Sequence, residues 1–316
     1  MKKKALVTGG IAKDVTAIGV FVINLKQTNP ALVDEVVIFH DGISNKDQKA
    51  INSVFPCRFI YYQFPGYNPS DFSHHITDYF SQMVFCKYEC FRLLAEYSVV
   101  IWSDYDVVLL KSLSELVLPS NDRKGGLKFL TTDSAAMGSF MDTIKEVDMS
   151  RYNPGGIGIC GSLFVLFDTL NDYMKYYEWL LQKTKEWGKY LYAGEQASIN
   201  MLLQEFNIDV SNLEGGVYCV HPVHNTITEE TKILHAYGQP KFWSGLKNDI
   251  WEDNYRKWVT IGGSKVKERL FSFRLKRRVK NELRRIKQFF AKRWNYFNHL
   301  NRIRTERMDG WGVGGG

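Results

Sequence analysis

Two aspartates one residue apart, Asp104 and Asp106, are the residues of this sequence with the clearest potential for chemistry. They interrupt an apolar, β-branched run that extends from Ser98 to Leu110. Burying carboxylates in such a run is costly unless a partner compensates their charge, and a divalent cation is such a partner. Residues i and i+2 of a strand point to the same face, so both carboxylates can reach one hard cation. The alternative is a strand end capped by two solvated aspartates, because such triplets are common.

The elements that must position these aspartates are strands alternating with helices, which favours an α/β fold with a mostly parallel sheet covered by helices on both faces. The predicted strands are Ala5–Thr8, Val36–His40 and Arg58–Gln63, and the predicted helices are Val15–Leu25, Lys46–Val54 with a cap at Ser44 or Asn45, and Phe80–Glu96. The last helix leads directly into the aspartate strand. The pair therefore falls at the carboxyl end of a parallel strand, where open α/β sheets bind ligands.

Further along the chain the same patterns predict more elements of an α/β domain. They are a strand at Ile159–Phe167, a helix from Leu170 to about Trp187, a helix ending at Phe206, and short strand material near Val217–Val220.

Composition limits the function classes. With 316 residues, 45% of them hydrophobic and 14% aromatic, the chain can bury a large core in one domain, with or without an appendage. Five scattered cysteines favour reduced thiols in a cytosolic compartment over a disulfide framework. Cys86 and Cys90 match no familiar zinc spacing and are interpreted as buried structural thiols. No signal-peptide core is recognisable, and no run of about 18 apolar residues suggests a membrane span.

The opening Lys4–Gly10 segment looks like the start of a short-chain dehydrogenase. That interpretation fails because the next glycine is Gly19, too distant for the pyrophosphate turn.

Three stretches, taken in order, resemble the retaining glycosyltransferases of family 8, the glycogenin and lipopolysaccharide galactosyltransferase family, which has the GT-A nucleotide-sugar-binding fold. The first is the Asp104-x-Asp106 strand with the following Ser112-Leu113-x-Glu115-Leu116. The second is Glu195-Gln196 with Asn200, and the third is His235-x-x-Gly238-x-x-Lys241-x-Trp243. Each stretch is weak alone, but their joint order is moderately specific.

The resemblance implies that Asp104, Asp106 and His235 coordinate Mn²⁺, with Mg²⁺ as the alternative, and that this ion holds the diphosphate of a UDP-sugar. It implies that Glu195 and Gln196 are the catalytic residues facing the transferred sugar. The other implied contacts to the nucleotide sugar are Thr8, Gly9, Lys87, Asp104, Tyr105, Gly161, Ser162, Gly238 and Lys241.

The sequence departs from the family pattern at several of these positions. Thr8-Gly9 stands where the family usually has an aspartate that touches the nucleotide, and Lys87 stands where it has an arginine. Glu195 replaces an aspartate. The family's Asn-x-Gly strand is matched by Gly161 and Ser162, with Asn153 retained as a candidate in a nearby acceptor loop. His221 and His224 are interpreted as a structural or solvated pair and are kept out of the metal site.

The net charge of +7 is unevenly distributed. Lys265–Asp309 holds 16 Lys and Arg against 4 Asp and Glu, a net +12, which leaves −5 for residues 1–264. Apolar residues recur at helical spacing from Leu275 to Leu300, which predicts a basic amphipathic helix on an anionic membrane surface through residues 270–305. Packing on the catalytic domain or pairing with another copy is the alternative. The acidic remainder argues against nucleic-acid binding.

We therefore expect a GT-A catalytic domain at residues 1–263, a basic amphipathic helical tail at 264–309 and a disordered glycine-rich end at 310–316. The expected function is metal-dependent, retaining transfer of a hexose from a nucleotide sugar, UDP-glucose or UDP-galactose, to a saccharide acceptor of a cell-surface glycan or glycolipid. The expected location is the cytoplasm, peripheral on the inner face of the membrane. The alternative function is a non-catalytic membrane-surface protein that binds nucleotide sugars or serves as a scaffold.

Overall fold

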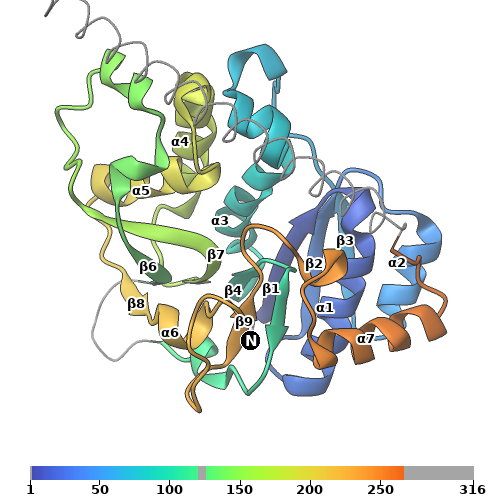
Figure 1. The fold of residues 1–316 in the computed structure, drawn as a ribbon. Coiled ribbons are helices and arrows are strands. Elements are labelled where there is room, and N and C mark those ends of the chain that lie inside the picture. The colour runs from blue at the N-terminus through green and yellow to red at the C-terminus, as the bar shows by residue number, and fades with distance from the viewer. Residues whose placement is uncertain (1, 120–125, 267–316) are drawn as a thin grey trace, which may run out of the picture. The chain divides into compact units, whose positions relative to one another are not determined.

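A seven-stranded sheet forms the centre of the fold, with strand order β3-β2-β1-β4-β7-β6-β8 (Figure 1). The computed structural model describes residues 2–119 and 126–266. The strands of this sheet are β1 (Lys3–Gly10), β2 (Glu35–His40), β3 (Cys57–Tyr61), β4 (Tyr97–Ser103), β6 (Leu127–Ala135), β7 (Ile157–Phe167) and β8 (Ser211–Leu213). The first four in sequence pair in parallel, as do β6 and β8, whereas β7 runs antiparallel to both of its neighbours. The predicted mostly parallel α/β sheet is confirmed.

Continuous apolar runs explain why the central strands lie in the middle. Ala5–Val7 of β1 and Val100–Trp102 of β4 are at most 1% exposed, because helices cover both faces of the sheet. On one face of the sheet, Ala5, Val7, Val100 and Trp102 belong to a hydrophobic cluster that also includes Phe85, Tyr88 and Phe164.

A second, two-stranded sheet lies beside the ends of the main one. It consists of β5 (Val107–Leu109) and β9 (Ile233–His235), which pair antiparallel with Val107 opposite His235. Because β5 follows β4 after only three residues, this small sheet begins where the aspartates lie.

Seven α-helices are present in the described residues: α1 (Val15–Thr28), α2 (Asn45–Asn52), α3 (Glu89–Leu93), α4 (Tyr173–Glu186), α5 (Glu195–Glu205), α6 (Gly215–Tyr218) and α7 (Asp249–Thr260). Ser44 caps α2 by accepting a hydrogen bond from Asp47 N–H, as its position in the sequence predicts. Helix α7 lies alongside α1 (Figure 1), and Gly19 of α1 leaves the space that the Trp258 ring occupies.

Two local predictions were wrong. The single helix expected over Phe80–Glu96 is instead a π-helical turn (His75–Phe80), a 3₁₀ segment (Gln82–Tyr88) and the short helix α3, separated at Ser81 by a φ of 152°. The strand expected near Val217–Val220 is mostly helix α6, and only Val220 makes a β-bridge, to Leu234.

The basic tail beyond Val266 and the glycine-rich end lie outside the described residues. Residues up to Lys265 form one compact unit. Within the described part of the chain, no helix combines the length and the apolar character needed to cross a bilayer.

Candidate active site

Backbone hydrogen bonds fix the aspartate turn between the two sheets. Asp104 N–H donates to the carbonyl of Ser162 on β7 at 2.9 Å, and the Asp106 carbonyl accepts from Ala236 N–H at 2.9 Å. The indole of Trp102, two residues before Asp104 on the strand, donates to Asp104 Oδ1 at 2.9 Å. The turn is therefore held from β7, from the end of β9 and from its own strand.

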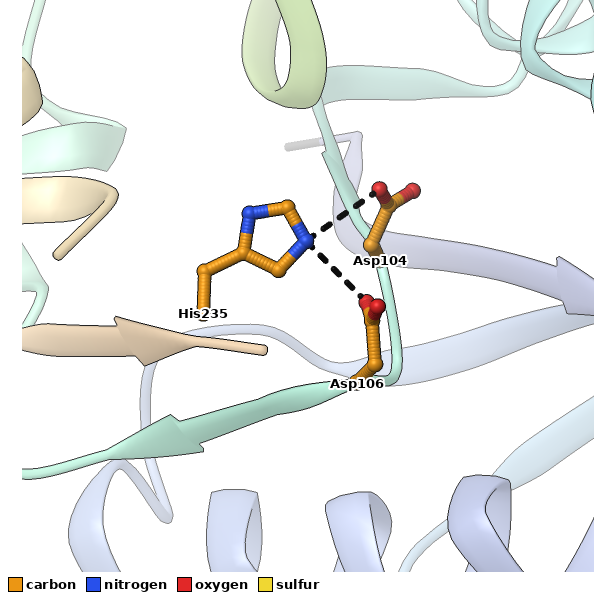
Figure 2. Close-up of side chains that lie close together, drawn as sticks. All are labelled: Asp104, Asp106 and His235. Atoms are coloured by element: carbon orange, nitrogen blue, oxygen red, sulfur yellow. Dashed lines mark ion pairs between the residues drawn. The ribbon is translucent and has the colours of Figure 1, made fainter. Parts of the chain in front are cut away.

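Asp104, Asp106 and His235 converge, and each offers a ligand atom within 4.8 Å of the others. His235 Nε2 lies 3.2 Å from Asp106 Oδ1 and 3.8 Å from Asp104 Oδ2 (Figure 2). Asp106 and His235 are buried, and Asp104 is partly exposed. Two carboxylates and one imidazole nitrogen aimed at a common point suit a divalent cation such as Mn²⁺, Mg²⁺ or Zn²⁺ by the chemistry of the donor set.

The charges of this triad are balanced by neighbouring cations. Burial alone would raise the pKa of Asp106, but His235 and then Lys241 outweigh it and hold that pKa well below its usual range. Burial lowers the pKa of His235, yet the Asp106 and Asp104 carboxylates raise it above its usual value. Lys241 Nζ contacts Asp106 Oδ2 and donates to the Ala236 carbonyl at 2.9 Å. Lys241 thus forms an ion pair with Asp106, a predicted metal ligand.

Lys87 joins the aspartate turn to the predicted catalytic residue Glu195. Its buried ammonium lies 2.7 Å from Glu195 Oε1 and 3.2 Å from Asp104 Oδ1, and it donates to the Gly161 carbonyl at 2.9 Å. Burial would lower the pKa of Lys87, but Asp104 and Glu195 raise it, so this lysine is charged. Burial raises the pKa of Glu195 to about 7 against the opposing effect of Lys87. Lys87 and Glu195, which were predicted as separate site residues, therefore form one buried ion pair.

Gly161 and Gln196 complete this side of the site. Gly161 N–H donates to Gln196 Oε1 at 2.9 Å. A Cβ at Gly161 would lie only 2.1 Å from Glu195 Oε1, so the close approach of Glu195 requires glycine there. Asn153 instead donates its backbone N–H to Gln204 Oε1 at 2.7 Å, on the exposed side of α5.

The predicted donor contacts at the amino end are less accessible. Thr8 is fully buried, and its hydroxyl has no hydrogen-bond partner among the described residues. A Cβ at Gly9 would lie 2.4 Å from Cys86 Sγ, inside the protein. The structure therefore does not bring the Thr8 side chain to an open surface.

Tyr105 and Gly238 are close in sequence to the predicted metal ligands, Tyr105 between the two aspartates and Gly238 shortly after His235. The Tyr105 hydroxyl donates to Asp14 Oδ2 at 3.0 Å, and its ring stacks on Trp243 with centroids 5.9 Å apart. Gly238 has a φ of +73° and open space around its Cα, a backbone conformation that favours glycine.

Sequence reasoning missed Cys219, whose Sγ lies 3.2 Å from His235 Nδ1. No local signal marks this cysteine, because its approach to His235 depends on the β-bridge between Val220 and Leu234. His221 and His224 stack on each other with centroids 4.2 Å apart, and His221 Nδ1 accepts backbone N–H groups of its own loop.

Comparison with known proteins supports a family assignment. Residues 10–124 match the family model described as Glycosyl transferase family 8. No curated protein matches the sequence significantly.

Solved structures share the fold at low sequence identity. The bifunctional glycosyltransferase WbbM in its apo form superposes with a TM-score of 0.59 and 14% identity, covering 86% of this chain and 51% of that one. The chain thus spans about half of the WbbM chain. The galactosyltransferase LgtC, in complex with donor and acceptor sugar analogues, gives 0.55 and 14%, covering 84% and 98%. The apo glycosyltransferase GlyE of Streptococcus pneumoniae gives 0.55 and 17%, covering 82% and 62%.

The family match includes the aspartate pair, and the similarity to the solved structure of LgtC covers 84% of this chain. Together they show that residues 10–124 are similar to glycosyltransferases of family 8 and that the chain shares the GT-A fold of the solved glycosyltransferases.

Proposed function

We propose that this chain is a metal-dependent retaining glycosyltransferase that transfers a hexose from UDP-glucose or UDP-galactose to a saccharide acceptor. The observation that carries the proposal is the convergence of Asp104, Asp106 and His235, residues that the family resemblance assigns to the metal site. Crystals of the structurally similar LgtC contain donor and acceptor sugar analogues, which supports the same classes of substrate for this chain.

The proposed cofactor is Mn²⁺, held by Asp104, Asp106 and His235. When bound, such an ion supplies positive charge that stabilises the diphosphate leaving group. Lys241, partly exposed beside Asp106, is close enough to the site to place a second positive charge on the phosphates.

In the proposed reaction, the bond between the anomeric carbon and the diphosphate oxygen breaks, and the acceptor oxygen forms its bond on the same face. The departing diphosphate oxygen takes the acceptor proton. Gln196, oriented by the Gly161 N–H, faces the sugar and recognises its hydroxyls. Glu195, paired with Lys87, supplies negative charge near the positive character that develops at the anomeric carbon.

The proposed acceptor belongs to a cell-surface glycan or glycolipid, and the proposed location is the inner face of the cytoplasmic membrane. This part of the proposal is supported by the net +12 of Lys265–Asp309 and the helical apolar spacing within it.

Donor hydrolysis tests the proposal directly. The full-length protein is incubated with UDP-glucose, UDP-galactose and other common UDP-sugars, with Mn²⁺ or with a chelator, and released UDP is measured. We expect release that requires the metal, and a loss of at least about 100-fold in Asp106→Asn, because one ligand and its charge are removed.

Lys183→Ala is the matched control, because Lys183 forms an ion pair with Glu186 on α4, outside the site. Absence of UDP release from every donor, together with unchanged nucleotide affinity in Asp106→Asn, would leave the non-catalytic binding module as the better description.

A further inference from the structure

The two ring nitrogens of His235 have different surroundings. Nε2 faces the carboxylates of Asp106 and Asp104, at 3.2 and 3.8 Å. Nδ1, on the other side of the ring, lies 3.2 Å from the thiol of Cys219. The hydrogen bond at one nitrogen of a metal-binding histidine sets which nitrogen is free for the metal and how the ring is oriented.

The position of Cys219 is fixed by the backbone on both sides. Cys219 N–H donates to the Gly215 carbonyl at 2.9 Å, which closes helix α6. The next residue, Val220, donates to Ile233 O at 3.2 Å and accepts from His235 N–H at 2.9 Å. The segment that carries Cys219 is therefore paired with the strand that carries His235.

The thiol is also supported from β7. Ser162 Oγ lies 3.7 Å from Cys219 Sγ and 3.2 Å from Cys160 Sγ. The backbone carbonyl of the same Ser162 accepts the N–H of Asp104. One strand of the main sheet thus supports both the ligand Asp104, through its backbone, and the ligand His235, through Cys219.

We propose that Cys219 is a positioning residue of the metal site, whose thiol, backed by Ser162 and Cys160, holds the His235 ring with Nε2 toward the two aspartates. This inference rests on the metal site of the proposed function. A thiol is a weaker hydrogen-bond partner than the carboxylate or carbonyl that usually supports a metal-binding histidine. Metal affinity in this chain therefore depends on a soft, small side chain.

The test measures Mn²⁺ binding to the full-length protein by the electron paramagnetic resonance signal of free Mn²⁺, without substrate. Removing the outer partner of a metal ligand commonly weakens affinity by about 10- to 100-fold, and we expect Cys219→Ala to fall in that range. Cys219→Ser keeps a small group that can accept from Nδ1, and it should recover most of the affinity. Cys57→Ala, on the edge strand β3, is the matched control and should bind like the wild type.

Thermal unfolding without metal separates positioning from a general structural effect. The inference predicts that Cys219→Ala and Cys219→Ser unfold at similar temperatures but differ in Mn²⁺ affinity. It is overturned if Cys219→Ala binds Mn²⁺ as tightly as the wild type, or if the serine variant is as weak as the alanine variant. If the wild type binds no Mn²⁺, or binds it as well after Asp106→Asn, the proposed metal site itself fails and the inference falls with it.

Discussion

Each aspartate of the metal triad has its own lysine partner. Lys87 pairs with Asp104 and Lys241 with Asp106. Lys87 lies in the helical segment that precedes β4, whereas Lys241 is 135 positions from Asp106. These pairs supply the compensation that two carboxylates in an apolar run require. Lysine and histidine side chains therefore balance the charge of the two carboxylates.

The Lys87 pair should be important for stability. Lys87→Met would leave Glu195 and Asp104 without their cation in a buried site, and we expect the free energy of unfolding to fall by about 3–5 kcal/mol. Denaturant titration measures this change. Lys183→Met, which breaks an ion pair of α4, should cost less than about 1 kcal/mol, and a similar cost for both variants would contradict the interpretation.

Metal binding should depend on pH through His235. Asp106 and Asp104 raise its pKa above 6.5 against the effect of burial, so the protonated ring and its pairing with Asp106 stabilise the fold at and below pH 6.5. That contribution disappears as the pH rises through the raised pKa. A metal needs the neutral ring, so Mn²⁺ affinity should rise by about tenfold per pH unit below this pKa and level off above it.

Calorimetric Mn²⁺ titrations in buffers of different ionisation enthalpy can measure both the affinity and the protons released. Binding that is independent of pH between pH 6 and 8 would exclude His235 as a ligand.

At the scale of elements, helix α1 holds the end of strand β5 and the segment that follows it. The buried Asn24 amide donates to the Leu109 carbonyl at 3.2 Å, and its Oδ1 accepts from Leu109 N–H. Asn29 makes the same kind of contact with Leu113 N–H at 2.7 Å. Both asparagines form hydrogen bonds with the backbone that follows the aspartate turn.

Asn24→Ala should therefore destabilise the protein by about 2–4 kcal/mol, because it leaves two buried backbone groups of Leu109 unpaired. Urea unfolding followed by circular dichroism measures the loss. Lys26→Ala on the exposed face of the same helix is the control, with an expected change within about 1 kcal/mol. Equal effects would show that the Asn24 contacts add nothing to helix packing.

The elements that can be predicted best are those marked by a local pattern in the sequence. Strands buried on both faces, such as β1 and β4, are continuous apolar runs, and α2 begins at a serine cap. The Phe80–Glu96 pattern is helical, but nothing in it reveals the φ of 152° at Ser81 that breaks it. Strand β6 carries Lys and Thr, so its pattern is too polar to be recognised. Tertiary pairing decides such segments.

The site was partly predictable for the same reason. The convergence of Asp104, Asp106 and His235 could be predicted from the family resemblance, because that resemblance rests on the order of these residues along the chain. The pairing of Lys87 with Glu195 could not be predicted, since it joins segments 108 positions apart in the chain. The approach of Cys219 to His235 depends on the bridge between Val220 and Leu234, which no pattern in the sequence marks.

At the scale of the whole molecule, the end of the described domain is held at Ser264. Its N–H and hydroxyl donate to the Asp47 carboxylate at 2.8 and 2.9 Å, and its carbonyl accepts from Thr16 and Trp258. A shortened protein must therefore retain this residue if the tail alone is to be tested.

A chain that ends at Val266 should keep the thermal unfolding midpoint of the full protein and lose binding to anionic liposomes, because it lacks the basic residues beyond that point. A chain that ends at Gly262 should be less stable by about 3 kcal/mol, since its hydrogen bonds to a carboxylate are lost. Sedimentation with vesicles of anionic and neutral lipid measures the binding. Unchanged partition of the Val266-terminated chain would refute the membrane proposal.

The triad also constrains how the protein can be divided. Lys241 and Asp106 are 135 positions apart in the chain. Strand β9, which pairs with β5, follows all the strands of the main sheet in the sequence. Contacts of such long sequence separation form at a high entropic cost and are slow to form in folding. The segment matched by the family model, residues 10–124, carries two of the three candidate metal ligands, but it contains neither strand β9 nor Lys241. No fragment that ends before β9 can therefore assemble the site, and binding competence is acquired only by the nearly complete domain.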